Sequence, residues 1–496
     1  MWNDNDPRAS NDFYHGSAVM TDAAATVGDV GSDLGYCPNC AILPIRVSDS
    51  FMGEGNKIAQ GVLYAVDRGA KVIAIAMGGI TNSSFLQDAF EYAHSRGVTI
   101  IAAVGDELTY HHLPPGVNDY AIPVHSIEFW PIVSVNTART FLAFNGCNNF
   151  GAHLALVAAT NDCATGAVAV TAGVAGLIYS RALDHGLELS ADEVRAILTR
   201  SATDINVPES QRPGSPYFPS HPGWDQFFGY GRLNARHAVD LATPGTIPPE
   251  VYVHAPRWYE YIDPRVTPEI ALDAHLAAPR ANGFTYAVEW APGADVRDAA
   301  FLPLTAGSSN QAMDGIVFRW PVASIPADLL DPAAPLEAIS GDDPLLDKLE
   351  MVNAYTLTVR IRVQDDQGNT AEHRKTFFLR EDPDLVAGFP LEIGPGESSP
   401  SLYDVDGDGL NEIVVGTSDG KVHAFHANGR EVTGWPVQVG SMPGVDPASP
   451  EGHSSAAPYA DGVVPARQGI LGNVTPTDLE GDGRAEVLVS TLDGWL

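Results

Sequence analysis

The chain has 496 residues, enough for about three domains with substantial cores. It carries 62 acidic and 28 basic residues, which excludes nucleic acid and anionic membrane surfaces as partners because both repel a strongly negative protein. The N-terminal residues are polar and acidic, so we predict no signal peptide at the start of this chain. No membrane span is expected, because the most apolar run, around Ala167 to Tyr179, is short and interrupted.

Predicted helices and strands alternate over the first 245 residues. Apolar residues recur at helical spacing from Ile58 to Val66 and from Leu86 to Ala93, and Gly97 is a typical helix end. Apolar strands are predicted at 72–76 and 98–103, and a capping box begins a further helix at Ser190. This alternation predicts an α/β domain with a parallel, doubly wound sheet.

Several motifs occur in a fixed order along the same residues. His15 begins His-Gly-Ser-Ala-Val, residues 72–79 read Val-Ile-Ala-Ile-Ala-Met-Gly-Gly, residues 166–176 end in Val-Ala-Gly, and residues 229–235 read Gly-Tyr-Gly-Arg-Leu-Asn-Ala. Together they resemble the subtilisin-like serine peptidase family, and residues 1–245 are identified as its peptidase domain. The resemblance also implies that residues 37–47 contain one of the family's buried strands.

The resemblance implies a degenerate catalytic site. His15 falls on the general base, Val168 on the serine nucleophile, and Asp106 on the asparagine that stabilises the oxyanion. The alternative for His15 is a helix-start histidine retained for its packing. An isopropyl group can neither lose a proton nor attack a carbonyl, so Val168 predicts loss of activity. The nearest hydroxyls do not replace it, because Thr165 lies about one helical turn earlier and Ser180 far beyond.

Two further expectations follow from the family pattern. Met77, Gly78 and Gly79 fall on the wall of the substrate pocket, where glycine allows a substrate backbone to come close. The strand that carries the triad aspartate is expected before the first residue, so the domain is N-terminally truncated. Asp4, Asp6 and Asp12 are too near His15 in sequence to replace that aspartate.

The cysteines form two local pairs, Cys37 with Cys40 and Cys147 with Cys163. A Cys-x-x-Cys motif also occurs in redox and metal sites, but no second ligand pair with zinc-like spacing is present. We therefore expect disulfides formed in an oxidising compartment, in a secreted or cell-surface protein.

Residues 246–384 are predicted to form a β-sandwich, of immunoglobulin-like type. A linker rich in proline and threonine precedes it at 243–249. From 355 to 363 apolar residues alternate with Thr and Arg, which predicts a half-buried strand. The turn at Asp365–Asn369 then leads to a second strand through Phe377.

Residues 385–496 contain an internal repeat. Gly388-Phe389-Pro390 recurs as Gly434-Trp435-Pro436, and an acidic loop followed by a strand occurs twice. The acidic residues of the two loops are Asp404, Asp406, Asp408 and Glu412, and Asp478, Glu480, Asp482 and Glu486.

Carboxylates at alternate positions around tight glycine turns suit Ca²⁺, which prefers oxygen ligands. An EF-hand is excluded, because the twelfth loop position is a valine and a strand follows. The repeat resembles the FG-GAP repeats of integrin-type β-propellers, which implies calcium in both loops. The propeller is expected to be incomplete, because the chain stops within a blade; solvated acidic turns without metal are the alternative.

Three functions are consistent with these patterns. The first is a secreted subtilisin-like protein that is catalytically inactive and binds proteins or peptides through its old cleft. The second is an active serine endopeptidase with a nucleophile elsewhere. The third is a calcium-dependent adhesion protein whose first domain is a scaffold.

Overall fold

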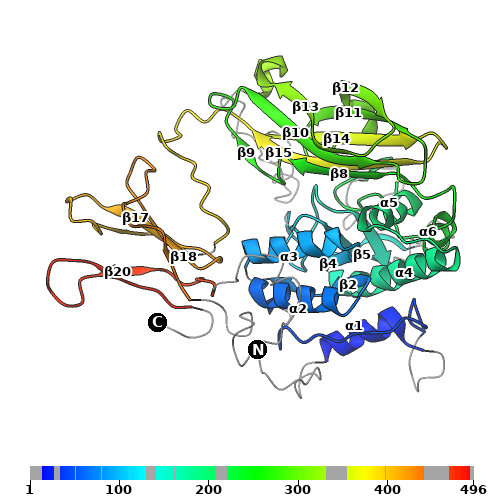
Figure 1. Ribbon diagram of the computed structural model, residues 1–496, viewed down its shortest axis with the longest axis horizontal. Coiled ribbons are helices and arrows are strands. Elements are labelled where there is room, and N and C mark those ends of the chain that lie inside the picture. The colour runs from blue at the N-terminus through cyan, green and yellow to red at the C-terminus, as the bar shows by residue number, and fades with distance from the viewer. Residues whose placement is uncertain are drawn as a thin grey trace.

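Figure 1 shows the protein as a computed structural model. The structure describes residues 14–26, 34–50, 52–79, 81–110, 112–129, 141–160, 162–206, 220–330, 355–396, 398–440 and 468–491. The expectations for Asp4, Asp6 and Asp12, and for the end of the chain at Leu496, lie outside the described residues.

The first part of the chain is an α/β domain built on one sheet. Strands β2, β4 and β5 run parallel in that order. Strand β7 also pairs with β5 in parallel, whereas β6 is antiparallel to β5. The bounds are β2 Val72–Ile75, β4 Thr99–Ala103, β5 Ala121–Phe129, β6 Phe141–Phe144 and β7 Leu156–Ala159. The expected α/β architecture is therefore present.

Helices cover both faces of this sheet. On β4, Ile100 and Ala102 pack with α2 (Gly55–Asp67) and α3 (Ser84–Ser95), whereas Ile101 and Ala103 face the core that contains α4 (Ala164–Asp184). Successive strand residues point to opposite faces, so one apolar strand serves two cores. The remaining helices are α1 His15–Ala24, which packs on α4, α5 Ala191–Ser201, and α6 Ala235–Leu241.

Local signals explain where these helices begin and end. The Glu54 carboxylate accepts two backbone N–H groups at the start of α2, and the Ser83 hydroxyl accepts that of Leu86 in α3. The capping box predicted at Ser190 is formed with Glu193 in α5, and Gly97, after α3, has a φ of 68°.

Helix α4 is the one helix among the described residues that is long and apolar enough to cross a membrane, and 67% of its most apolar stretch is buried within the protein. Packing on the sheet accounts for this apolar character.

The strand expected within residues 37–47 is not formed. Residues 41–47 have no regular secondary structure, and Ile42 and Leu43 are exposed. No described strand offers backbone groups to this segment, and a strand needs a neighbour to satisfy its N–H and C=O groups.

The second part of the chain contains two antiparallel sheets that share one core, with Leu272 and Val359 among its fully buried residues. One sheet has the order β13-β10-β8, and the other β12-β11-β14-β15-β9, in which β9 is parallel to β15. The bounds are β8 Glu250–Ala255, β9 Tyr261–Ile262, β10 Glu269–Ala277, β11 Phe284–Pro292, β12 Leu302–Ser309, β13 Met313–Pro321, β14 Thr356–Asp365 and β15 Thr370–Leu379, with short 3₁₀ helices η2 Asp298–Ala300, η3 Val322–Ser324 and η4 Ala327–Leu329.

Strand β14 differs from the half-buried strand that its alternation predicts. Thr356, Thr358 and Arg360, on its polar face, are as buried as the apolar face. Arg360 bonds Glu289 and Asp298 and lies over the ring of Phe301, so a polar network covers this face.

Lys375 joins the first two parts of the chain. Its side chain, on β15, is fully buried, and its ammonium donates to Asp119 of the α/β domain and to the carbonyls of Val253 and His254. The Tyr252 hydroxyl also donates to Asp119. The α/β domain and the two-sheet part therefore share a desolvated polar interface.

The last part of the chain contains a four-stranded antiparallel sheet and a separate two-stranded sheet (Figure 1). A small core that includes Val414, Val422, Ile470 and Val474 joins them. The bounds are β16 Ser401–Tyr403, β17 Glu412–Gly416, β18 Lys421–Phe425, β19 Val437–Gln438, β20 Thr475–Thr477 and β21 Glu486–Leu488. The described residues contain no closed propeller.

Candidate functional site

The N-terminal end of α4 is where the predicted catalytic positions come closest to one another. The helix begins at Ala164, and Cys163 occupies the N-cap without a side-chain hydrogen bond. The first N–H groups of a helix lack intrahelical partners and carry partial positive charge, so this end favours an anion.

Asp106 supplies that anion. It follows the carboxyl end of β4, and its Oδ1 accepts a 2.9 Å hydrogen bond from the Ala164 N–H. Burial raises the pKa of the Asp106 carboxyl, and this hydrogen bond opposes the rise. Asp106, at the predicted oxyanion position, therefore binds the first N–H group of α4 with its own carboxylate.

His15 lies at the start of α1, which packs against α4. Partial burial lowers the pKa of its imidazole, and the negative charge of Asp162 raises it. Asp162 lies two residues before Ala164, so the histidine lies close to the α4 N-terminus.

Val168 lies one turn deeper in the same helix. Its side chain is fully buried in the core that also contains Ile127 and Phe144. Asp106 therefore contacts a residue four positions before Val168, which is about one helical turn. The register that puts Val168 at the nucleophile position stays a prediction.

The Gly78–Gly79 segment forms the short strand β3, which pairs in parallel with β1 (Met52–Gly53). The Gly79 N–H also donates to the Pro114 carbonyl. A Cβ added to Gly79 would lie 3.0 Å from that carbonyl oxygen, and one added to Gly78 would lie 3.0 Å from the Leu113 side chain. The backbone contact thus favours glycine at 79, whereas a Cβ at 78 meets only the flexible ends of Leu113 and Met52.

Both cysteine pairs are disulfides, with Cα–Cα distances of 5.4 Å for Cys37–Cys40 and 5.8 Å for Cys147–Cys163. The first packs on α4, where a Cβ on Gly176 would lie 2.7 Å from the Cys40 sulfur. The second anchors the N-cap of α4. The pairing expected from the sequence is confirmed.

The two acidic loops have the same internal hydrogen bonds. In the first, Asp404 accepts the N–H groups of Gly407 and Gly409, and Glu412 accepts that of Val405. In the second, Asp478 accepts those of Gly481 and Gly483, and Glu486 that of Leu479. The first carboxylate of each loop therefore holds the turn.

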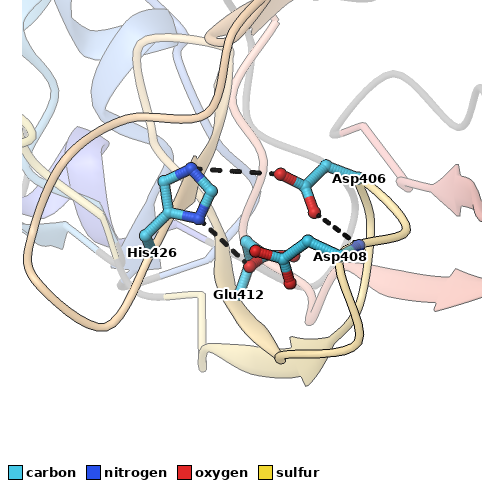
Figure 2. Close-up of side chains that lie close together, drawn as sticks. All are labelled: Asp406, Asp408, Glu412 and His426. Atoms are coloured by element: carbon cyan, nitrogen blue, oxygen red, sulfur yellow. Dashed lines mark hydrogen bonds and ion pairs between the residues drawn. The ribbon is translucent and has the colours of Figure 1, made fainter.

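The first loop also meets a histidine that the sequence patterns did not indicate. Asp406, Asp408, Glu412 and His426 each offer a ligand atom, and these atoms all lie within 4.8 Å of one another (Figure 2). His426 follows β18, and only the pairing of β17 with β18 brings it beside Glu412. No spacing rule for a single loop would include it.

Comparison with known proteins gives the class of the first part. Residues 1–231 match the Subtilase family. Thermitase from Thermoactinomyces vulgaris is 29% identical over 245 residues, which cover 48% of this chain and 78% of thermitase. A thermophilic serine proteinase from Bacillus sp. (strain AK1) is 26% identical, covering 48% of this chain and 54% of the relative.

A cell wall-associated protease from Bacillus subtilis (strain 168) is 30% identical, and the match covers 47% of this chain but 27% of that protein. Among solved structures, the prenylagaramide maturation protease PagA is 18% identical with a TM-score of 0.37, covering 48% of this chain and 85% of that one. The N-terminal part of the chain is thus similar to the Subtilase family and to serine peptidases of that family.

Proposed function

We propose that the subtilisin-like domain has no peptidase activity and that the protein acts outside the cell by binding protein or peptide ligands. The observation that carries the proposal is the N-terminal end of α4. The Asp106 carboxylate accepts the Ala164 N–H in the first turn of this helix, about one turn before Val168. Val168, at the predicted nucleophile position, has no hydroxyl. If the first turn holds the nucleophile position instead, Thr165 supplies the hydroxyl that the active-endopeptidase alternative needs.

The electrostatics of this end support the same conclusion. Removal of the serine nucleophile from a subtilisin costs about 10⁶-fold in turnover. Loss of the oxyanion donor alone costs about 10²–10³-fold. Here the Asp106 carboxylate uses the Ala164 N–H and, when ionised, repels a developing oxyanion.

A fluorophosphonate probe tests the proposal on the full chain. We expect no labelling of the parent and none of the His15→Ala control. The variants Thr165→Ala and Val168→Ser, the latter combined with Asp106→Asn, test which register is right, since labelling of the parent that is lost in Thr165→Ala would assign the nucleophile to Thr165. Labelling of the parent at a mapped hydroxyl that is lost in His15→Ala would overturn the proposal in favour of an active endopeptidase.

Ligand binding is proposed at β3, by addition of an extended peptide strand. The Pro114 carbonyl already accepts the Gly79 N–H, so a peptide must displace that segment, which predicts weak binding. Fluorescence anisotropy with labelled peptides tests this idea. Gly78→Ala should weaken binding, whereas Gly16→Ala, where a Cβ meets open space, should not; no saturable binding would exclude β3 as the binding site.

Calcium-dependent adhesion is the second candidate, supported by the shared hydrogen bonding of the two acidic loops. Attachment of the full chain to a protein-coated surface should then require Ca²⁺. It should fail in EGTA and in the double variant Asp408→Asn, Asp482→Asn. Attachment that is equal in all three conditions would rule this function out.

A further inference from the structure

The first acidic loop and His426 form a mixed nitrogen and oxygen cluster. We propose that it binds a first-row divalent transition-metal ion, with Zn²⁺ as the reference ion, through Asp406, Asp408, Glu412 and His426. The proposal shares a loop with the calcium-dependent candidate but does not depend on it, because it concerns a different ligand set.

Two neighbouring strands hold the core of this cluster. Ile413 on β17 is the register partner of Phe425 on β18, so Glu412 and His426 lie opposite each other at the next position. The distance from Glu412 Oε1 to His426 Nδ1 is 3.3 Å. Two ligands of a tetrahedral zinc ion lie about 3.3 Å apart, given metal–ligand bonds of about 2.0–2.1 Å.

The loop brings the other two carboxylates to the same place. Asp406 Oδ2 lies 4.0 Å from His426 Nε2, the other ring nitrogen, and in Figure 2 the two ring nitrogens face Asp406 and Glu412 respectively. A single ion would use one of these nitrogens, and one ligand atom from each of the four residues lies within 4.8 Å of the others. Asp404 is not among these four residues; its two oxygens accept backbone N–H groups of the turn.

Burial makes these groups suitable ligands. The side chain of Glu412 is 1% exposed and that of His426 is 20% exposed, so both are largely removed from water. Asp406 and Asp408 are exposed, so water partly screens their repulsion with Glu412, and a bound cation relieves what remains.

The donor set indicates which cation. Calcium takes oxygen ligands, whereas imidazole nitrogen favours zinc, copper, nickel and iron. The second acidic loop provides an internal comparison, since no histidine of the described residues joins its carboxylates in such a cluster. Among the described residues, the second loop lacks this nitrogen donor, and it has Glu480 where the first has Asp406.

Isothermal titration of the full, EDTA-treated chain with Zn²⁺ and, separately, with Ca²⁺ tests the proposal. We expect Zn²⁺ affinity to fall at least about tenfold in His426→Ala and in Asp408→Asn, with little change in Asp482→Asn. His185→Ala removes an exposed histidine at the end of α4 and should leave Zn²⁺ affinity unchanged. His426→Gln, with a matched thermal melt, separates lost coordination from lost folding.

A second readout uses Co²⁺ as a spectroscopic substitute. Visible d–d absorption that appears with the parent and disappears in His426→Gln would support nitrogen coordination at this site. Equal Zn²⁺ affinity in the parent and in both His426 variants would overturn the proposal, and would leave His426 as an ion-pair partner of the carboxylates. If Zn²⁺ affinity is equal in this way but Ca²⁺ still binds, calcium-dependent adhesion stays a candidate function. If Zn²⁺ binding requires His426 and Ca²⁺ does not bind, calcium-dependent adhesion is excluded.

Discussion

At the scale of single residues, Asp225 is a buried carboxyl whose charged form is unfavourable in the folded protein. Its side chain is almost fully buried, and its Oδ1 accepts the N–H groups of Phe227 and Phe228, while Oδ2 has no hydrogen-bond partner. Burial, and then the charge of Asp295, raise the pKa of Asp225 to about 8. The folded protein therefore favours the protonated form.

The pH dependence of this group has a definite sign. The pKa of Asp225 is 3.8 in the unfolded chain and about 8 in the folded protein. The stability that this group contributes is therefore complete below pH 3.8 and is lost as the pH rises through about 8. At pH 7 the cost is on the order of 4 kcal/mol. Asp225→Asn should thus raise the melting temperature near neutral pH and have little effect at about pH 4.

Differential scanning calorimetry at the two pH values measures this effect. Asp240→Asn is the matched control, since Asp240 forms an exposed ion pair with Arg236 and should change stability by less than about 1 kcal/mol. A melting temperature of Asp225→Asn that differs equally from the parent at both pH values would contradict the assignment.

At the scale of helices and strands, sequence periodicity predicted what depends on local contacts. Helices α2 and α3 follow their apolar spacing, and β4 follows its apolar run, because each buries a face that its own residues define. The same approach found the acidic loops, whose hydrogen bonds are local. It did not find His426, since only the register of two strands brings that residue to Glu412.

Strand β14 shows where the periodic pattern is insufficient. Alternating Thr and Arg predicts a solvent-facing side, but a buried charge network covers it. Arg360 bonds Glu289 at 2.9 Å and Asp298 at 2.7 Å. Polar alternation therefore identifies the strand, whereas the burial of its polar face depends on residues far away in sequence.

This network supplies a matched pair of variants. Arg360 and Arg362 both bond Glu289, but the side chain of Arg360 is 4% exposed and that of Arg362 is 52% exposed. Arg360→Ala removes the buried partner of Glu289, which then keeps only the half-exposed Arg362, and should cost about 3 kcal/mol of unfolding free energy. Arg362→Ala should cost less than about 1 kcal/mol.

Urea denaturation followed by tryptophan fluorescence measures both variants. Trp290 belongs to the core beneath the network, so its emission reports on this part of the chain. Similar losses in Arg360→Ala and Arg362→Ala would mean that burial does not set the energy of these ion pairs.

At the scale of the whole molecule, the first two parts of the chain are joined by polar groups as well as by apolar packing. Lys375, fully buried, donates at 2.8 Å to Asp119, and the Tyr252 hydroxyl donates to the same carboxylate at 3.0 Å. Burial lowers the pKa of the Lys375 ammonium, and Asp119 opposes that change. The Lys375 ammonium is therefore stabilised mainly by Asp119 of the α/β domain, and the Asp119 carboxylate by Lys375 and Tyr252 of the two-sheet part.

This arrangement predicts that the two parts unfold together and that Lys375 couples them. Lys375→Met removes the ammonium and leaves Asp119 with the tyrosine alone, which should destabilise the interface by about 3–5 kcal/mol. We expect the calorimetric transition of these parts to split or broaden, and proteolysis between residues 243 and 249 to become faster. Asp119→Asn combined with Lys375→Met should recover part of the loss, because no unpaired charge then remains buried. An unchanged single transition in Lys375→Met would show that apolar packing alone holds the α/β domain against the two-sheet part.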